Sequence, residues 1–193
     1  MKFFFAILMG LSLHACASSQ PATTAPGTRQ PQSDANAHAF GLRPLPASTW
    51  EILSNGRITN LRDILLASGK KSAIFQFAGV TCLTCQHDAE EYTRRIQGSS
   101  LKDKITHVAV FTDFPEDFQE SDFSTFMTKF APQSLRTQDD HARLWLSLQK
   151  NQAAPDRNVI IVLGQSGQGL SLNEATSHDI IFGALETLAS GAQ

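Results

Sequence analysis

An apolar segment that ends in two closely spaced cysteines constrains this chain more than any other feature. Residues Ser72–Ala78 read Ser-Ala-Ile-Phe-Gln-Phe-Ala, and Cys82-Leu83-Thr84-Cys85 follows after Gly-Val-Thr. The apolar segment predicts a buried strand, and helical spacing of apolar residues begins at Cys85. A strand that leads into a helix places the first sulfur at the helix N-terminus, where N–H donors and the helix dipole favour thiolate over thiol. The pair therefore predicts dithiol–disulfide chemistry at a strand-to-helix junction.

The rest of the globular region, which begins at Ala47, alternates predicted strands with predicted helices. The strand expected at 158–163 is entirely apolar after Asn158, which is typical of a central strand covered on both faces. This order of elements predicts an α/β fold with a mixed central sheet flanked by helices. The other expected strands are Ile105–Phe111 and 170–172. The expected helices are 60–67 and 116–130, together with one that ends at Gly98, one that begins at Asp139-Asp140 and one that begins near Ser177.

The first sixteen residues read as an export signal and not as part of the fold. Lys2 precedes an apolar stretch, 3–13, that is too short to span a bilayer. Leu13-His14-Ala15-Cys16 follows and resembles the bacterial lipobox, in which the cysteine is lipidated and becomes the new N-terminus. The resemblance implies a lipid anchor at Cys16. Because no aspartate follows that cysteine, it also implies the outer membrane of the cell envelope, facing the periplasm. An ordinary secretory signal, cleaved near Ala15 or Ala17, is the alternative.

A flexible linker is expected between the anchor and the folded domain. Residues 17–46 hold five of the eight prolines and a single aromatic residue, Phe40, so they carry little apolar surface to offset the entropy of ordering. The formal net charge of −2 gives no reason to expect nucleic acid as a partner. The chain is therefore divided into a signal at 1–16, a linker at 17–46 and one domain at 47–193.

The segment that runs from Ser72 to Cys85 carries a resemblance to a known family. It aligns without gaps with the strand and active site of the thioredoxin fold, and in particular of the TlpA-like, membrane-attached thiol–disulfide oxidoreductases. Asn55-Gly56-Arg57 and Gly69-Lys70 also resemble the segments that lead into that strand, and the resemblance covers residues 50–189. It implies a thioredoxin-like fold, protein thiols and disulfides as substrates, a redox partner protein, and no cofactor or bound metal.

The expected mechanism gives the two cysteines different roles. Cys82, at the helix start, is the expected nucleophile, and Cys85, one turn further on the apolar face, is the expected resolving thiol. Ala154-Pro155 lies where the family places a cis-proline that faces the two sulfurs and leaves room for substrate backbone. A loop proline that ends the preceding helix is the alternative for this position.

Three departures from the family pattern limit what the resemblance implies. Ala78 and Thr81 stand where the family usually has tryptophans, so the apolar rim of the site is reduced. Leu83 and Thr84 stand between the cysteines, where the family usually has proline directly before the second cysteine. Residues at these two positions tune the thiol pKa and the redox potential, so the direction of electron transfer stays open. Gln76 stands where thioredoxins bury an aspartate, and it can form hydrogen bonds but cannot act as a base.

Other uses of a C-x-x-C motif fit this chain less well. Covalent haem attachment requires histidine directly after the second cysteine, where Gln86 stands. A structural zinc site needs four ligands, and only two cysteines remain once Cys16 is lipidated. A module for interaction without redox activity is a further alternative, which the retention of both cysteines at this junction disfavours.

A copper-binding protein similar to the Sco-type chaperones is the main alternative. Residues 112–132 resemble the corresponding segment of those proteins, and two thiolates with a histidine suit Cu(I). However, that family spaces its cysteines by three residues, and no histidine lies near Asp156, where its distal histidine is expected. The histidines that would have to substitute are His87, His107, His141 and His178.

Overall fold

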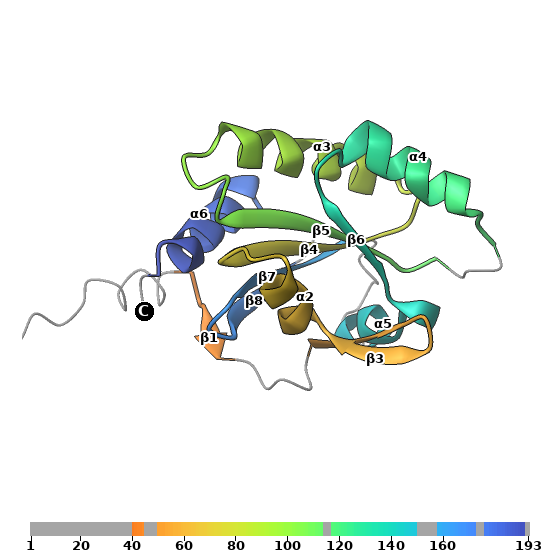
Figure 1. Ribbon diagram of the computed structural model, residues 1–193, viewed down its shortest axis with the longest axis horizontal. Coiled ribbons are helices and arrows are strands. Elements are labelled where there is room, and N and C mark those ends of the chain that lie inside the picture. The colour runs from red at the N-terminus through yellow and green to blue at the C-terminus, as the bar shows by residue number, and fades with distance from the viewer. Residues whose placement is uncertain (1–39, 45–49, 114–116, 150–157, 173–175, 192–193) are drawn as a thin grey trace, which may run out of the picture. The chain divides into compact units, whose positions relative to one another are not determined.

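A computed structural model of the chain describes residues 40–44, 50–113, 117–149, 158–172 and 176–191. The strands of its main sheet are β1 (Arg43–Pro44), β4 (Ser72–Ala78), β5 (Ile105–Phe111), β6 (Leu135–Gln138), β7 (Val159–Gly164) and β8 (Gln168–Leu172). Their order across the sheet is β1-β8-β7-β4-β5-β6 (Figure 1). Strands β4, β5 and β6 run parallel, whereas β7 and β8 are antiparallel to their neighbours. This mixed sheet confirms the predicted α/β architecture.

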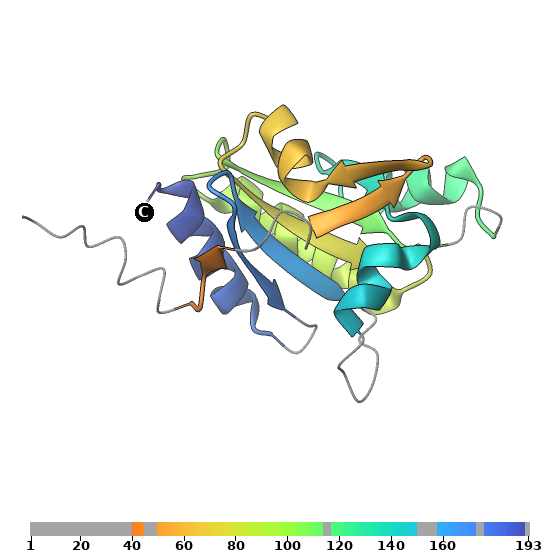
Figure 2. The same ribbon diagram turned by 90° about the horizontal axis from the view of Figure 1, so that it is seen from below.

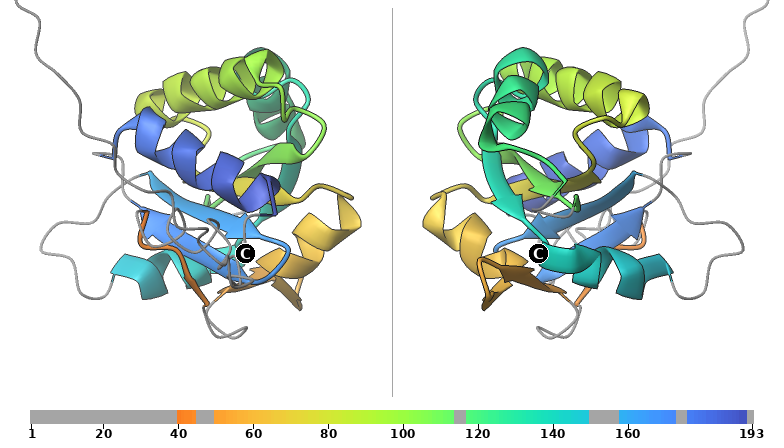
Figure 3. Two further views of the ribbon diagram at one scale, coloured as in Figure 1. Left: turned by 90° about the vertical axis from the view of Figure 1, so that its left-hand side faces the viewer. Right: turned by 90° about the vertical axis from the view of Figure 1, so that its right-hand side faces the viewer.

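Helices cover both faces of the sheet (Figures 2 and 3). Helices α3, α4 and α6 pack on one face, and α2, α5 and the hairpin β2–β3 pack on the other. The bounds of these elements are α2 (Leu61–Ala67), α3 (Leu83–Gly98), α4 (Glu120–Phe130), α5 (Arg143–Gln149), α6 (His178–Ala189), β2 (Glu51–Ser54) and β3 (Arg57–Asn60). In the part of the chain with described structure, no helix is both long and apolar enough to cross a bilayer.

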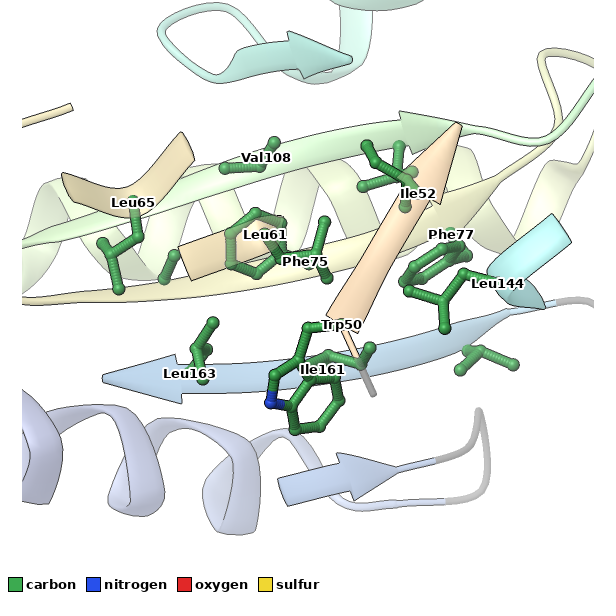
Figure 4. Close-up of a cluster of buried hydrophobic side chains, with 13 residues drawn as sticks. Trp50, Ile52, Leu61, Leu65, Phe75, Phe77, Val108, Leu144, Ile161 and Leu163 are labelled. Atoms are coloured by element: carbon green, nitrogen blue, oxygen red, sulfur yellow. The ribbon is translucent and has the colours of Figure 1, made fainter. Parts of the chain in front are cut away.

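The central strands are buried on both faces, which explains their nearly continuous apolar sequence. Every residue of β4, β5 and β7 is buried. Phe75 and Phe77 of β4 point toward the hairpin face, where they pack with Trp50 and Ile52 (Figure 4). The alternate residues of β4, which include Gln76, consequently point toward α3.

The hairpin β2–β3 and the strand β6 form although the sequence did not predict them. The hairpin β2–β3 turns at Asn55-Gly56, and both residues have positive φ, 51° and 71°, as a type I′ turn requires. Strand β6 lies at the edge of the sheet and pairs with β5 alone. Each of these three strands is only four residues long and mixes polar with apolar positions, so its periodicity is weak.

The helices on either side of β6 begin later than the sequence predicts. Helix α4 begins at Glu120 and not at 116, because Gln119 and Asp122 form a reciprocal capping box there. The predicted helix at Asp139-Asp140 is instead a 3₁₀ turn, Asp140–Ala142, followed by α5. The buried Asp139 carboxylate accepts hydrogen bonds from the backbone N–H groups of Leu144 and Trp145 at the start of α5.

Residues 40–44, which the sequence assigns to the predicted linker, contact the folded domain. Leu42 is buried in the core between the sheet and α6, and Arg43 of β1 pairs with Gly169 of β8. A Cβ atom placed on Gly183 of α6 would lie 2.6 Å from the ring of Phe40, so the two segments approach closely. Residues 40–44 therefore pack with the folded domain, because this short segment supplies both an edge strand and an apolar core residue.

Three of the candidate site residues lie outside the described ranges. They are Cys16, Ala154 and Pro155. Lipidation of the first and the geometry of the Ala154-Pro155 bond therefore stay predictions.

Candidate active site

The two cysteines of the motif meet at the carboxyl end of the central strand. Strand β4 ends at Ala78, a short turn follows, and α3 begins at Leu83, immediately after Cys82. A disulfide joins Cys82 to Cys85, whose Cα atoms are 5.2 Å apart, a usual separation for such a bond. The structure therefore brings together the two residues that the sequence predicts to be reactive.

The two sulfurs have different environments. Cys82 is half-buried and is the N-cap of α3, where its Sγ accepts a hydrogen bond from the backbone N–H of Cys85 at 3.2 Å. The Thr84 hydroxyl lies 3.3 Å from the same sulfur. Cys85 has no exposed surface. In the reduced protein, the donors around Cys82 and the helix N-terminus would favour its thiolate. This asymmetry fits the predicted roles of an accessible nucleophile and a buried resolving thiol.

The turn before Cys82 is held from both sides. The N–H of Val80 donates to the carboxylate of Asp113 at 2.8 Å, and the Gln86 side chain donates to the Val80 carbonyl at 2.8 Å. Asp113 follows β5, whose carboxyl end lies beside that of β4 because the two strands are parallel. Burial raises the pKa of Asp113, and the hydrogen bond from Val80 opposes that shift. Asp113 was not predicted from the sequence, although an acidic residue just after a predicted strand was a signal for it.

A chain of buried polar side chains lies behind Cys85. Gln76 of β4 has no exposed surface, and its Nε2 donates to the carbonyl oxygen of Cys85 at 2.9 Å. Its Oε1 lies 3.0 Å from Nε2 of His107 on β5, and Nδ1 of His107 lies 2.8 Å from the hydroxyl of Ser134. Gln76 therefore does more than fill a polar position, because it links the first turn of α3 to a neighbouring strand.

The groups in this row of hydrogen-bonded side chains determine which partner donates in each hydrogen bond. A carbonyl can only accept, so Gln76 turns its amide nitrogen toward Cys85 and its oxygen toward His107. His107 must then carry its proton on Nε2, and its Nδ1 accepts from the Ser134 hydroxyl. Burial lowers the pKa of His107 to about 3, so the imidazole is neutral near neutral pH. The chain behind Cys85 thus carries no charge.

The outer end of this chain reaches a polar cavity. The cavity has a volume of about 300 Å³, and Ser134 and His107 line it together with Lys70, Thr93 and Lys102. Hydrogen bonds thus connect this solvent-facing cavity to the backbone of the buried cysteine. The predicted strand position of His107 is confirmed, whereas its link to the cysteines was not predicted.

A second polar cluster joins α3 to the beginning of β7. Asp88, one turn after Cys85, accepts a hydrogen bond from the Asn158 amide, and Nε2 of His178 lies 3.1 Å from its other carboxylate oxygen. Asn158 immediately precedes β7 and is fully buried. The active-site helix is therefore tied to the segment where the chain enters β7.

The exposed rim of the site consists of the residues around Cys82. Leu83 is 78 % exposed, and Thr81 and Thr84 are also exposed. Ala78, by contrast, is fully buried. The rim therefore carries one aliphatic side chain and two hydroxyl groups.

Three of the histidines in the described ranges have partners other than the two cysteines. Both ring nitrogens of His107 have partners, namely Gln76 and Ser134, and His178 is paired with Asp88. The side chain of His87 is 78 % exposed and its Nδ1 lies 3.7 Å from Asp88. Within the described ranges, no three histidine, cysteine or acidic side chains lie close enough together to hold a metal ion.

The fold and the position of the disulfide together define a thioredoxin-fold protein. Among solved structures, the chain is similar to a thioredoxin-like protein from Aeropyrum pernix, with a TM-score of 0.51 and 16% identity over 73% of this chain and 88% of that one. It is also similar to MTB DsbF, solved in mixed oxidised and reduced forms, with a TM-score of 0.50 and 16% identity over 77% of this chain and 99% of that one. A thioredoxin-like superfamily protein matches with a TM-score of 0.52 and 12% identity over 72% of this chain and 94% of that one.

These similarities confirm the predicted thioredoxin-like fold. No protein-family model matches the sequence. No curated protein matches it either.

Proposed function

We propose that this protein is a thiol–disulfide oxidoreductase that exchanges disulfides with protein substrates through Cys82 and Cys85. The observation that carries the proposal is the asymmetric disulfide at the N-terminus of α3. Its outer sulfur is half-buried and accepts a helix N–H, and its inner sulfur is fully buried. A disulfide between residues three positions apart closes too short a loop to contribute much stability, so a purely structural role is a weak explanation.

The exchange proceeds through two displacement steps at sulfur. In the reduced protein, the Cys82 thiolate attacks a substrate disulfide, forms a mixed disulfide and releases one substrate thiolate, which takes up a proton. Cys85 then loses its proton and attacks Sγ of Cys82, which forms the internal disulfide and releases the second substrate thiol. The substrate disulfide is reduced and the protein dithiol is oxidised, with two electrons transferred. The reverse direction uses the same bonds.

Export and membrane attachment complete the proposal. The lipobox-like Leu13-His14-Ala15-Cys16 supports a lipid anchor on the outer membrane facing the periplasm, and the linker gives the domain reach from that surface. Ala154-Pro155 is proposed to face the sulfurs. The contact between Asp88 of α3 and Asn158, three residues after Pro155, supports this placement. A redox partner protein would restore the dithiol or the disulfide after each turnover.

A stoichiometric exchange reaction tests this function. The reduced protein is mixed with an unfolded polypeptide that carries one disulfide, and both are followed by alkylation and mass spectrometry. We expect one substrate disulfide to be lost for each Cys82–Cys85 disulfide formed. A protein in which both cysteines are serine provides the background rate. Oxidation of the dithiol without loss of the substrate disulfide would argue against the proposal.

A further inference from the structure

A groove with an aromatic floor and an acidic rim opens beside the disulfide. It has a volume of about 350 Å³ and lies between the turn before Cys82 and the segment that contains α4. Phe118, Phe126 and Phe130 supply its apolar surface, and Asp117 and Asp122 stand at its exposed rim. The residues that complete its lining are Val80, Thr81, Gln86 and Thr125.

The apolar surface of the groove continues into the surroundings of the disulfide. Cys82, Phe118 and Phe130 lie at the edge of one buried cluster whose centre includes Phe126. The rings of Phe126 and Phe130 are 5.5 Å apart at their centroids. Thr81 lines the groove and directly precedes Cys82, so the groove begins one residue from the reactive sulfur. A polypeptide bound to Cys82 could therefore reach the groove with its next residues, because each extended residue spans about 3.3 Å.

The charge of the groove is negative. Its lining includes two carboxylates and, among the described residues, no basic side chain. Arg136, a cation on the neighbouring β6, is already paired with Glu120 and lies over the ring of Phe123, 4.7 Å from its centroid. Asp122 also serves the capping box at the start of α4, whereas no ion pair of the described structure involves Asp117.

From these features we propose that the groove binds the substrate polypeptide next to its reactive cysteine. It selects an aromatic or branched aliphatic side chain within about three residues of that cysteine, accompanied by a lysine or arginine. The apolar side chain packs on the phenylalanine rings, and the basic group faces Asp117 and Asp122. This inference rests on the proposed function, and it names the substrate class that the site favours.

The test uses peptide thiols that react with the oxidised protein in one step. The peptide thiolate attacks Sγ of Cys82, which forms the peptide–Cys82 disulfide and leaves Cys85 as a thiol after it takes up a proton. Three peptides are compared that are identical except beside their single cysteine, where they carry Lys-Phe, Glu-Phe or Lys-Ala. Reaction of each peptide with β-hydroxyethyl disulfide corrects for its intrinsic thiol reactivity.

The Lys-Phe peptide should react about five- to tenfold faster than either other peptide. The Glu-Phe peptide reverses one exposed charge, and the Lys-Ala peptide removes one partly buried ring, and an effect of this size is expected for each change. Asp117→Lys should lower the ratio of the Lys-Phe to the Glu-Phe rate by about the same factor. Glu90→Lys, an equal charge reversal on the exposed side of α3, should leave that ratio at its wild-type value. Salt at 1 M should also lower the ratio, since charges are screened over about 3 Å under that condition.

Three equal peptide rates, or equal changes of the ratio in Asp117→Lys and Glu90→Lys, would overturn the inference about the groove. These outcomes differ from failure of the proposed function, in which none of the peptides would open the Cys82–Cys85 disulfide.

Discussion

Replacing Cys85 with serine should make the protein accumulate substrate polypeptides that are disulfide-linked to Cys82. Serine oxygen cannot displace a thiolate from a disulfide, so the second step of exchange is lost while the first remains. The lifetime of the mixed disulfide should lengthen from seconds to about hours, the slow end of disulfide reshuffling. Non-reducing gels followed by mass spectrometry of the adducts measure this directly.

The matched control is Cys82→Ser, which keeps the buried thiol and removes the accessible one. It should form no such adducts, because Cys85 has no exposed surface from which to attack. Equal trapping by both variants, or trapping by neither, would show that the two roles are assigned wrongly. The structure makes this comparison sharp because only one of the two sulfurs is reachable.

The second large effect is expected at His107, whose Nε2–H donates to Gln76 behind the resolving cysteine. The amide nitrogen of an asparagine at this position would reach only the place of Nδ1 of His107. His107→Asn therefore leaves the buried Oε1 of Gln76 without a hydrogen-bond donor. This change should lower the free energy of unfolding by about 1–3 kcal/mol. It should also slow the attack of Cys85 by about tenfold if the misplacement costs the transition state about 1.4 kcal/mol. Denaturant unfolding and the lifetime of the mixed disulfide are the two measurements.

His107→Gln is the corresponding rescue variant. Glutamine places its amide nitrogen near the position of Nε2, so the donor to Gln76 is retained while the bond to Ser134 is lost. Ser134 is half-buried and lines a cavity, where water can replace the lost partner. Recovery of both stability and resolution rate in this variant, but not in His107→Asn, would separate the hydrogen bond from general packing. Equal damage in both variants would contradict the positioning role.

The same histidine predicts a characteristic dependence of stability on pH. Its pKa in the folded protein is about 3, whereas an unfolded histidine has a pKa of about 6.5, so the unfolded state binds more protons between these values. The free energy of unfolding should therefore fall as pH decreases from about 6.5 toward 3, by up to about 1.4 kcal/mol per pH unit. In the His107→Gln variant, this contribution to the dependence of the unfolding free energy on pH should be absent. An unchanged slope would mean that His107 takes up its proton while the protein is folded.

Much of the fold was predictable because its central strands have strong patterns. Ser72–Ala78 and Ile105–Phe111 are strands with the predicted bounds, and the last helix begins directly after Ser177. These segments are long, apolar and covered on both faces, so local pattern and tertiary burial agree. The hairpin β2–β3 was missed because its strands are short and of mixed polarity, although Asn55-Gly56 is a recognised turn signal.

The candidate site was only partly predictable. The cysteine pair and its position before a helix follow from local sequence. The contacts that surround the cysteine pair do not follow from local sequence. Gln76 and His107 are 31 residues apart in the sequence, and Val80 and Asp113 are 33 residues apart. Both contacts arise from the parallel pairing of β4 with β5, which the sequence does not specify residue by residue. Gln76 and His107, polar residues inside largely apolar strands, were the available signal for these buried hydrogen bonds.

The disulfide itself provides the most direct measurement of the central claim. The protein is equilibrated with glutathione redox buffers and with the more reducing dithiothreitol redox buffers, quenched in acid, and analysed for the fraction of Cys82–Cys85 disulfide. We expect a reversible two-electron transition, reached from either starting state, with the same midpoint. A pair that stays fully oxidised or fully reduced, or that shows different curves from the two directions, would contradict a redox role for Cys82 and Cys85.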